Sequence, residues 1–194
     1  MIFPSALMLK NRESGESRLF GLSLLGPEDA SLLYDFQQAQ LPTIQDPQTF
    51  QPLSREELEY ALSHGITIGV YAGEELCYFL NCLYPVPADN LGQDLGLAPE
   101  ELPHVAHLEV AISSPAARGW GIHQKVLELG LRLLGEDGRT RWVCATISPF
   151  NLPSLKPALK AGLEIALLKE KYGGLLRYIL VKELPAADTS RDNG

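Results

Sequence analysis

The chain has 194 residues, of which 45% are hydrophobic and 21% are charged, and this fits one globular domain with a sizeable core. Its formal net charge is -8 at pH 7. Such a charge argues against nucleic acid and anionic membranes as partners, because both are bound through clustered Lys and Arg.

Residues 1–17 form an amino-terminal segment without the features of a secretory signal. No basic residue precedes its short apolar run, and Lys10, Arg12 and Glu13 follow that run directly. No apolar run in the chain approaches transmembrane length. The three cysteines fall in expected strands without disulfide spacing, which is typical of a reducing compartment. We therefore expect a cytoplasmic protein whose thiols are free and buried.

Hydrophobic periodicity and turn residues predict the elements along the chain. In order, these are a strand at 18–25, helices at 28–40 and 54–65, strands at 66–72, 76–84 and 105–113, a helix from 122, a strand at 141–147, a helix at 154–161, and strands at 163–171 and 175–183. The order βααβββαβαββ, with hairpins at both Gly-containing turns, predicts an α/β protein of the α+β kind. Its mixed sheet is mostly antiparallel and is flanked by helices.

Two segments are harder to assign. Residues 85–104 are rich in proline and glycine, which predicts a long loop with one helical turn at 99–102, and substrate contacts and disorder both remain open for it. In the helix near 154–161, Ser154 is the expected cap, because Pro157 then falls in the first turn, where proline is tolerated. Asn151 is thereby left in the junction before that helix.

The stretch 107–134 runs a strand-like alternation into a proline, an Arg-Gly-Trp-Gly elbow and a helix without an ordinary cap. A strand that enters a helix through such a turn aims unpaired N–H groups and the positive end of the helix dipole at one point. Glycine at 119 and 121 lets the backbone approach phosphate oxygens, and Arg118 adds a positive charge. The elbow therefore predicts a phosphate-binding site.

Spacing separates three phosphate-binding patterns. A GxGxxG fingerprint needs glycine where Gln124 stands, and a P-loop needs a Gly-Lys-Ser/Thr ending that this segment lacks. The pattern that remains is RxxGx followed by a small residue. In this respect AISSPAARGWGIHQKVL (111–127) resembles the coenzyme A loop of the GNAT superfamily of acyl-CoA-dependent N-acyltransferases. SPFNLPSLKPALKAGLEI (148–165) resembles a later helix segment of that family, whose element order residues 18–184 match.

This resemblance implies a GNAT-like fold and acetyl-CoA as the acyl donor. It implies that residues 118–123 hold the pyrophosphate, that residues 110–112 pair their backbones with the pantetheine arm, and that Asn151 and Ser154 contact the coenzyme. The implied coenzyme contacts are Val110, Ala111, Ile112, Arg118, Gly119, Trp120, Gly121, Ile122, His123, Asn151 and Ser154.

Two positions depart from the family pattern. His123 stands where a small residue usually ends the loop, so either the backbone approach is altered there or the imidazole contacts a phosphate. Ala158 stands where many members carry the tyrosine that protonates the departing thiolate. The acid is therefore absent or comes from elsewhere, and Tyr172 and Tyr178 are the substitutes, with packing in the last hairpin as the alternative role of each.

Acyl transfer to an amine needs a base, a donor to the thioester oxyanion and a placed nucleophile. Alternation predicts His107, Glu109, Ala111 and Ser113 on one strand face, and the resemblance places a base or water-relay residue at His107 or Glu109. A solvated carboxylate and a core histidine remain the alternatives for these two. The backbone N–H of Ala111 is the expected oxyanion donor.

We expect an N-acetyltransferase that transfers an acetyl or other acyl group from acetyl-CoA to a primary amine of a small molecule or peptide, by direct attack in a ternary complex. The alternatives are a non-catalytic acyl-CoA sensor or interaction module, and a fold that has lost its coenzyme. We expect no metal, because His104 and His107 point to opposite strand faces and no third ligand is evident. Residues 185–194 are the expected polar, flexible tail, and a homodimer stays open.

Overall fold

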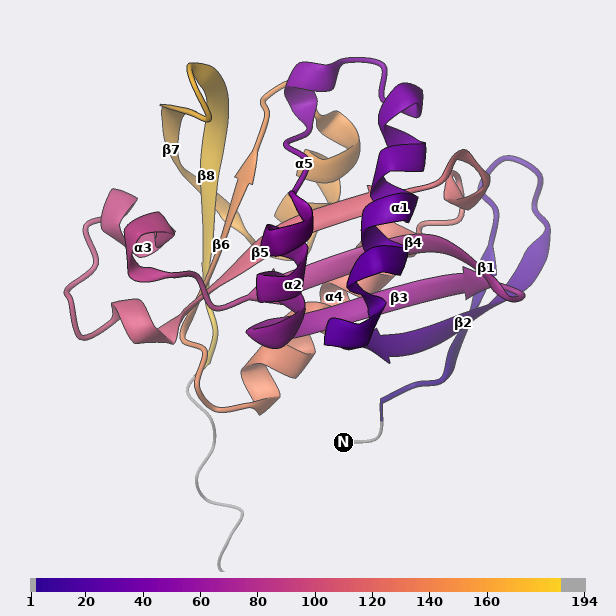
Figure 1. Cartoon of the computed structure of the whole chain (residues 1–194), viewed down its shortest axis with the longest axis horizontal. Helices are drawn as coiled ribbons and strands as arrows, with labels where there is room; N and C mark the ends of the chain where they lie inside the picture. Colours follow the sequence, from indigo (N-terminus) through magenta and orange to yellow (C-terminus); the bar gives the residue numbers. More distant parts are fainter. Residues whose placement is uncertain (1–2, 186–194) are drawn as a thin grey trace, which may run out of the picture.

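An eight-stranded sheet with helices on both faces makes up the protein, as a computed structural model describing residues 3–185 shows (Figure 1). The strand order is β1-β2-β3-β4-β5-β6-β8-β7, and β5 and β6 are the one parallel pair of neighbours in this sheet. The strands are β1 Ala6–Lys10, β2 Ser17–Leu25, β3 Gly65–Ala72, β4 Glu75–Leu83, β5 Val105–Ser113, β6 Trp142–Ile147, β7 Glu164–Lys171 and β8 Leu175–Glu183. The helices are α1 Ala30–Gln40, α2 Arg55–Ser63, α3 Leu91–Asp94, α4 Ile122–Glu136 and α5 Leu152–Lys160.

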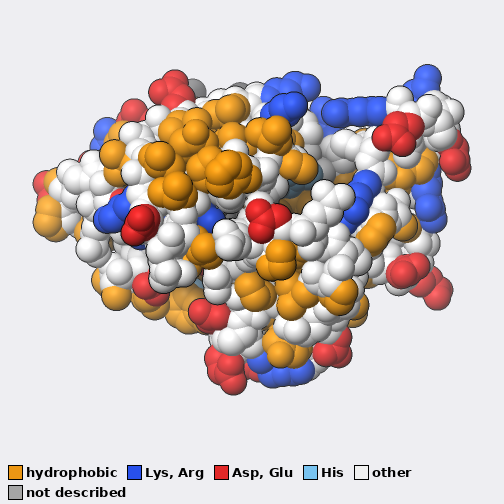
Figure 2. Space-filling model, turned by 90° about the horizontal axis from the view of Figure 1, so that it is seen from above, with side chains coloured by type: hydrophobic (Ala, Val, Ile, Leu, Met, Phe, Trp, Pro, Cys, Tyr) orange, Lys and Arg blue, Asp and Glu red, His pale blue; other side chains and the backbone are white. Residues whose placement is uncertain are grey.

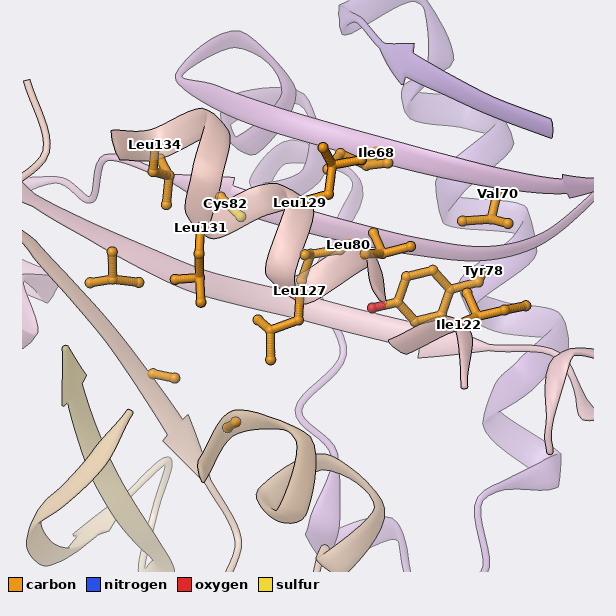
Figure 3. Close-up of a cluster of buried hydrophobic side chains, with 14 of the residues drawn as sticks. Ile68, Val70, Tyr78, Leu80, Cys82, Ile122, Leu127, Leu129, Leu131 and Leu134 are labelled. Atoms are coloured by element: carbon orange, nitrogen blue, oxygen red, sulfur yellow. The ribbon is translucent and has the colours of Figure 1, made fainter. Parts of the chain in front are cut away.

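Two layers of apolar side chains hold the helices on the sheet. On one face, α4 and α5 pack on the central strands, and Figure 3 shows Leu127, Leu131 and Leu134 of α4 against Leu80 and Cys82 of β4. On the other face, α1 and α2 cover a second cluster of buried apolar side chains, among which Leu33 is fully buried. The predicted mixed, mostly antiparallel sheet flanked by helices is confirmed.

The structure adds two elements to the predicted order. Strand β1 lies inside the segment 1–17, which the sequence placed outside the domain, and it pairs antiparallel with β2. Helix α3 forms a short turn within residues 85–104, held by the Asn90 side chain, which accepts a hydrogen bond from the Gly92 N–H at 2.9 Å. At the helical turn predicted for 99–102 the Leu102 N–H donates to the Pro99 carbonyl at 3.4 Å, and a 3-10 turn follows at Leu102–His104.

The start of α5 also differs from its prediction. Asn151, rather than Ser154, caps the helix, and its Oδ1 accepts a hydrogen bond from the Ser154 N–H at 3.3 Å. Pro157 consequently lies inside the helix and not in its first turn. The cap prediction failed because it weighed the cost of a proline in a helix interior above a good capping residue.

Strand β5 does not keep its expected alternation. The register with β4 shifts between the pairs Asn81 with Val110 and Cys82 with Leu108, which leaves Glu109 as the extra residue of a β-bulge. Beyond the bulge Ala111 faces α4, while Val110 and Ile112 face α1 and α2. The prediction that Ala111 and Ser113 share a face with His107 is therefore wrong, because one inserted residue exchanges the two faces.

Strands β5 and β6 are parallel neighbours over a short length only. Val105–His107 pairs with Trp142–Cys144, and beyond these residues the two strands diverge (Figure 1). In the part of the chain that the structure describes, the edge of β5 after His107 thus has no strand partner on the β6 side. Its outward N–H and C=O groups face the opening between the strands.

The remaining predictions concern the thiols and the chain ends. Cys77, Cys82 and Cys144 are free and buried, as expected. No helix in residues 3–185 is long and apolar enough to cross a membrane. Apart from residue 185, the predicted tail lies outside the described residues.

Candidate functional site

A cavity of about 180 Å³ occupies the opening between β5 and β6. It runs through the sheet, because its walls include Leu127 and Ala158 from the α4 and α5 side and residues 49–53 from the α1 and α2 side. Figure 2, which views the molecule from above relative to Figure 1, shows a hollow near the centre of the surface, with acidic and basic side chains at its rim. Residues from both faces of the sheet therefore meet at this cavity.

The glycine elbow leads from β5 into α4. Gly119 and Gly121 have φ angles of 81° and 72°, in the left-handed region that disfavours any residue with a Cβ. Within residues 3–185, no side chain caps α4 and no backbone acceptor pairs with the N–H groups of residues 121–124. These free donors lie at the positive end of a helix of 15 residues, where they could hold an anion.

The hairpin of β1 and β2 adds a residue to the elbow that the sequence did not single out. The Arg12 N–H donates to the Gly119 carbonyl at 3.0 Å. A Cβ built on Gly121 would meet the Arg12 guanidinium at 3.4 Å. Arg12 therefore brings a positive charge to the free N–H groups. Arg12 precedes the elbow by more than a hundred residues, so no local pattern pointed to it.

Residues 41–54 close one wall of the cavity and are tied to the elbow and to α5. The Arg118 guanidinium donates to the carbonyl and hydroxyl of Thr43, each at 3.3 Å. Asn151 Nδ2 donates to the Thr49 carbonyl at 3.2 Å, so the α5 cap also holds this loop.

Glu109 and His107 lie together at the bulge, as predicted. His107 is 5% exposed, and its Nε2 accepts a hydrogen bond from the Leu91 N–H at 3.1 Å. That acceptor role assigns the proton of the neutral ring to Nδ1, which lies 3.5 Å from Glu109 Oε2. His107 thus lies beside the Glu109 carboxylate, which lines the cavity.

Tyr172 reaches the cavity from the turn between β7 and β8. Its φ of 52° is the one positive value at a non-glycine residue in the described part of the chain, and its hydroxyl lies 2.8 Å from Thr146 Oγ1 on β6. Burial, and to a smaller extent the Glu109 charge, raise the pKa of Tyr172, so the phenol stays protonated at neutral pH. Tyr178, the other predicted substitute acid, packs against the core instead.

His123 points from the first turn of α4 toward β4. Its Nδ1 lies 2.7 Å from the hydroxyl of the fully buried Tyr78, and the ring also lines the cavity. Burial lowers the pKa of His123 to about 4 and raises the pKa of Tyr78 well above its ordinary value. The pair is therefore neutral, and His123 adds no positive charge to the elbow.

Apart from Arg118, Gly119 and Gly121 of the elbow, the predicted coenzyme contacts divide into two groups. Residues that line the cavity are Val110, Ala111, His123, Asn151 and Ser154. By contrast, Ile112, Trp120 and Ile122 are core residues, with Trp120 packed edge-on against Phe20 at 5.2 Å. Only their backbones remain free to contact a ligand.

A second cavity, of about 310 Å³, adjoins the first and shares Leu53, Glu57 and Glu109 with it. Glu56 and Asp89 add two further carboxylates to its walls. Among residues 3–185 no group of three or more His, Cys, Asp or Glu side chains is placed to hold a metal ion. The acidic lining favours a cationic ligand on this side.

Solved structures with the same architecture are acetyltransferases. A GNAT-family acetyltransferase from Streptococcus pneumoniae matches with a TM-score of 0.66 at 16% identity, over 86% of this chain and 99% of that one. NAA60 of Arabidopsis thaliana, in complex with a bisubstrate analogue, matches with a TM-score of 0.67 at 12% identity, over 87% and 99%. AAC(6')-Ib, in complex with ribostamycin and coenzyme A, matches with a TM-score of 0.60 at 17% identity, over 90% and 99%.

No family model and no curated protein match the sequence. The likeness to solved structures defines a fold class, and the predicted class is confirmed: the chain has the fold of the GNAT acetyltransferases. The elbow before α4 and the opening between β5 and β6 are both parts of this fold.

Proposed function

We propose that the protein is an acyl-CoA-dependent N-acyltransferase that moves an acetyl group from acetyl-CoA to a primary amine. The observation that carries this proposal is the uncapped start of α4 beside the cavity between β5 and β6. The free N–H groups after Gly121, with Arg12 and Arg118, would hold the diphosphate. The unpaired edge of β5 would then pair with the pantetheine arm as an added strand does.

The reaction we propose is direct attack in a ternary complex. Glu109, oriented by His107, takes a proton from the acceptor ammonium, directly or through a water molecule. The freed amine attacks the thioester carbon, and the backbone N–H of Ala111 donates to the oxyanion. When the tetrahedral intermediate collapses, the carbon–sulfur bond breaks, Tyr172 supplies a proton to the thiolate of coenzyme A, and the second proton of the attacking nitrogen returns to the Tyr172 oxygen. The products are an amide and free coenzyme A.

Release of free coenzyme A tests this function. Purified protein is incubated with acetyl-CoA and a panel of amines that covers polyamines, amino acids, aminoglycosides and peptides, and the thiol is titrated. We expect release that depends on one acceptor class. Silence across all classes would contradict an enzyme.

One observation favours a second function, a non-catalytic acyl-CoA sensor. Ala158, at the position of the usual tyrosine, is 2% exposed and brings no hydroxyl to the cavity. Tight acetyl-CoA binding by calorimetry, together with turnover that Glu109→Gln leaves unchanged, would favour the sensor.

We also propose that the protein works in the cytoplasm without a metal and without a nucleic-acid or membrane partner, in keeping with its net charge of -8. We propose a single acetyltransferase domain, residues 18–184 extended by β1 and the turn that carries Arg12. Sedimentation would distinguish the 21.3 kDa monomer from a homodimer.

A further inference from the structure

A buried arginine on the acceptor side of the cavity is not used by the proposed reaction. Arg177 lies on β8, is 3% exposed and lines the same cavity as Glu109 and Tyr172. Within residues 3–185 no carboxylate lies within 4.0 Å of its guanidinium. A cation taken out of water without an anion is costly, so such a group calls for an explanation.

The protein provides hydrogen-bond acceptors for only some of the N–H groups of this guanidinium. Nη1 donates to the Leu176 carbonyl at 2.9 Å, and Nη2 donates to the Gln48 carbonyl at 2.7 Å. A guanidinium carries more N–H groups than these two bonds use. The two carbonyls are neutral, so they orient the fork without cancelling its charge.

The neighbouring groups do not neutralise Arg177 either. The Tyr172 ring lies 5.6 Å from the guanidinium carbon, and its phenol is protonated at neutral pH. Asp46 acts on Arg177 from beyond ion-pair distance, while its carboxylate caps the turn at Gln48 by accepting the Gln48 N–H at 3.0 Å. Desolvation lowers the pKa of Arg177, and it remains a cation.

The cavity therefore carries opposite charges on different walls. Glu57 and Glu109 lie on the side that leads into the second, acidic cavity, and Arg177 lies on β8 beside Tyr172. A simple amine or a polyamine would satisfy the carboxylates and leave the arginine unpaired. A molecule with an amine and a carboxylate would satisfy both walls.

We infer that the acceptor is zwitterionic, an amino acid or short peptide whose amine lies at Glu109 and whose carboxylate pairs with Arg177. This inference rests on the proposed function, of which it names the substrate class. Charge-assisted bonds from a preoriented fork are suited to a carboxylate, and they position the amine for attack.

Matched acceptor pairs test the inference. Free amino acids and dipeptides are each compared with their carboxamides for release of coenzyme A and, with coenzyme A present, for binding by calorimetry. We expect at least a tenfold higher kcat/KM for the free carboxylate. The carboxamide has the less basic amine, which favours attack, so amine reactivity cannot produce this preference.

Variants of Arg177 make the test specific. In Arg177→Met we expect kcat/KM for the free carboxylate to fall about a hundredfold, mainly through KM, while that of the carboxamide changes less than threefold. In Arg177→Lys, kcat/KM for the free carboxylate should lie between the values of the natural protein and of Arg177→Met, because lysine keeps the charge and loses the planar fork of the guanidinium. Arg132→Met, which removes an exposed arginine from α4, is the control and should change neither value.

Three outcomes would overturn the inference: equal use of both members of each pair by the natural protein, an equal loss for both in Arg177→Met, or no acceptor bound while acetyl-CoA binds. If circular dichroism shows that Arg177→Met does not fold, two results decide the inference. These are the preference of the natural protein for the free carboxylate over the carboxamide, and the change of that preference in Arg177→Lys. Failure to bind acetyl-CoA at all would instead overturn the proposed function.

Discussion

At the scale of single residues, the proposed base Glu109 lies beside a histidine whose Nε2 lone pair already accepts the Leu91 N–H. The Leu91 N–H occupies the lone pair of His107 Nε2, so the ring presents Nδ1–H to the carboxylate. The sequence placed these two residues together but left open which one is the base. The feature that distinguishes the two side chains is the hydrogen bond from Leu91 to His107. Leu91 lies in residues 85–104, a segment that a strand pattern does not describe.

Glu109→Gln should lower kcat by about a hundredfold, because a general base contributes roughly that factor or more. The dissociation constant of acetyl-CoA should change less than twofold, since the carboxylate faces the acceptor. Steady-state kinetics and calorimetry measure the two values. Glu136→Gln, at an exposed position near the end of α4, is the matched control. An unchanged kcat in Glu109→Gln would remove Glu109 from the mechanism.

His123 should make the stability of the fold depend on pH. Its pKa is lowered from 6.5 to about 4 in the folded protein, so between these values the unfolded chain binds a proton that the folded one does not. Stability is therefore lost as pH falls through this window, by about 2 kcal/mol from pH 7 to pH 5. Urea unfolding at both pH values should show this loss in the natural protein.

His123→Gln is the comparison, because glutamine can still accept a hydrogen bond from Tyr78 and does not titrate. The variant keeps every other acidic and basic group, so the difference between the two proteins isolates the histidine. The same loss of stability in both proteins would show that His123 is not responsible.

At the scale of elements, local patterns predicted most helices and hairpins. The features that these patterns missed depend on contacts between residues far apart in the chain. Ser54 and Glu57 form a capping box at the start of α2, and all its partners lie within one turn. The bulge at Glu109 depends on the register of two strands, and β1 is stabilised by its pairing with β2. A sequence carries no local record of either contact.

Asn151 joins two elements, and two substitutions separate its roles. Asn151→Asp keeps the oxygen that caps α5 and loses the N–H group that holds Thr49. Asn151→Ala loses both and should lower the free energy of unfolding by about 1 kcal/mol more than the aspartate, the usual value of a cap. Chemical unfolding measures this difference. Equal losses in the two variants would mean that the tie to Thr49, and not the cap, matters.

At the scale of the whole molecule, the cavity is assembled from segments far apart in the chain. Residues 41–54 and the β7–β8 turn close it around β5, the elbow and α5. The resemblance to a family pointed to the elbow and to Asn151 because they belong to continuous motifs. It did not predict Arg12 or Arg177, although an arginine within the apolar run of β8 is a signal that strand patterns can be searched for.

Because so many segments meet at one ligand, acetyl-CoA should stabilise the whole fold. At a hundred times its dissociation constant a ligand adds about 2.7 kcal/mol, which corresponds to a rise in Tm of roughly 5–10 °C for a chain of this size. Thermal unfolding with and without acetyl-CoA measures the shift. No shift at saturating acetyl-CoA would contradict the coenzyme site.

Two glycine variants locate the source of this stabilisation. Gly121→Ala and Gly73→Ala both place a Cβ at a left-handed position and should each cost about 1–2 kcal/mol without ligand. Gly73 lies in the β3–β4 turn, where an added Cβ would have nothing within 4 Å, whereas a Cβ at Gly121 meets Arg12 at the free N–H groups of α4. Tenfold weaker binding removes about 1.4 kcal/mol, so Gly121→Ala should lose about half of the acetyl-CoA shift while Gly73→Ala keeps all of it. Equal shifts in both variants would place the diphosphate away from the elbow.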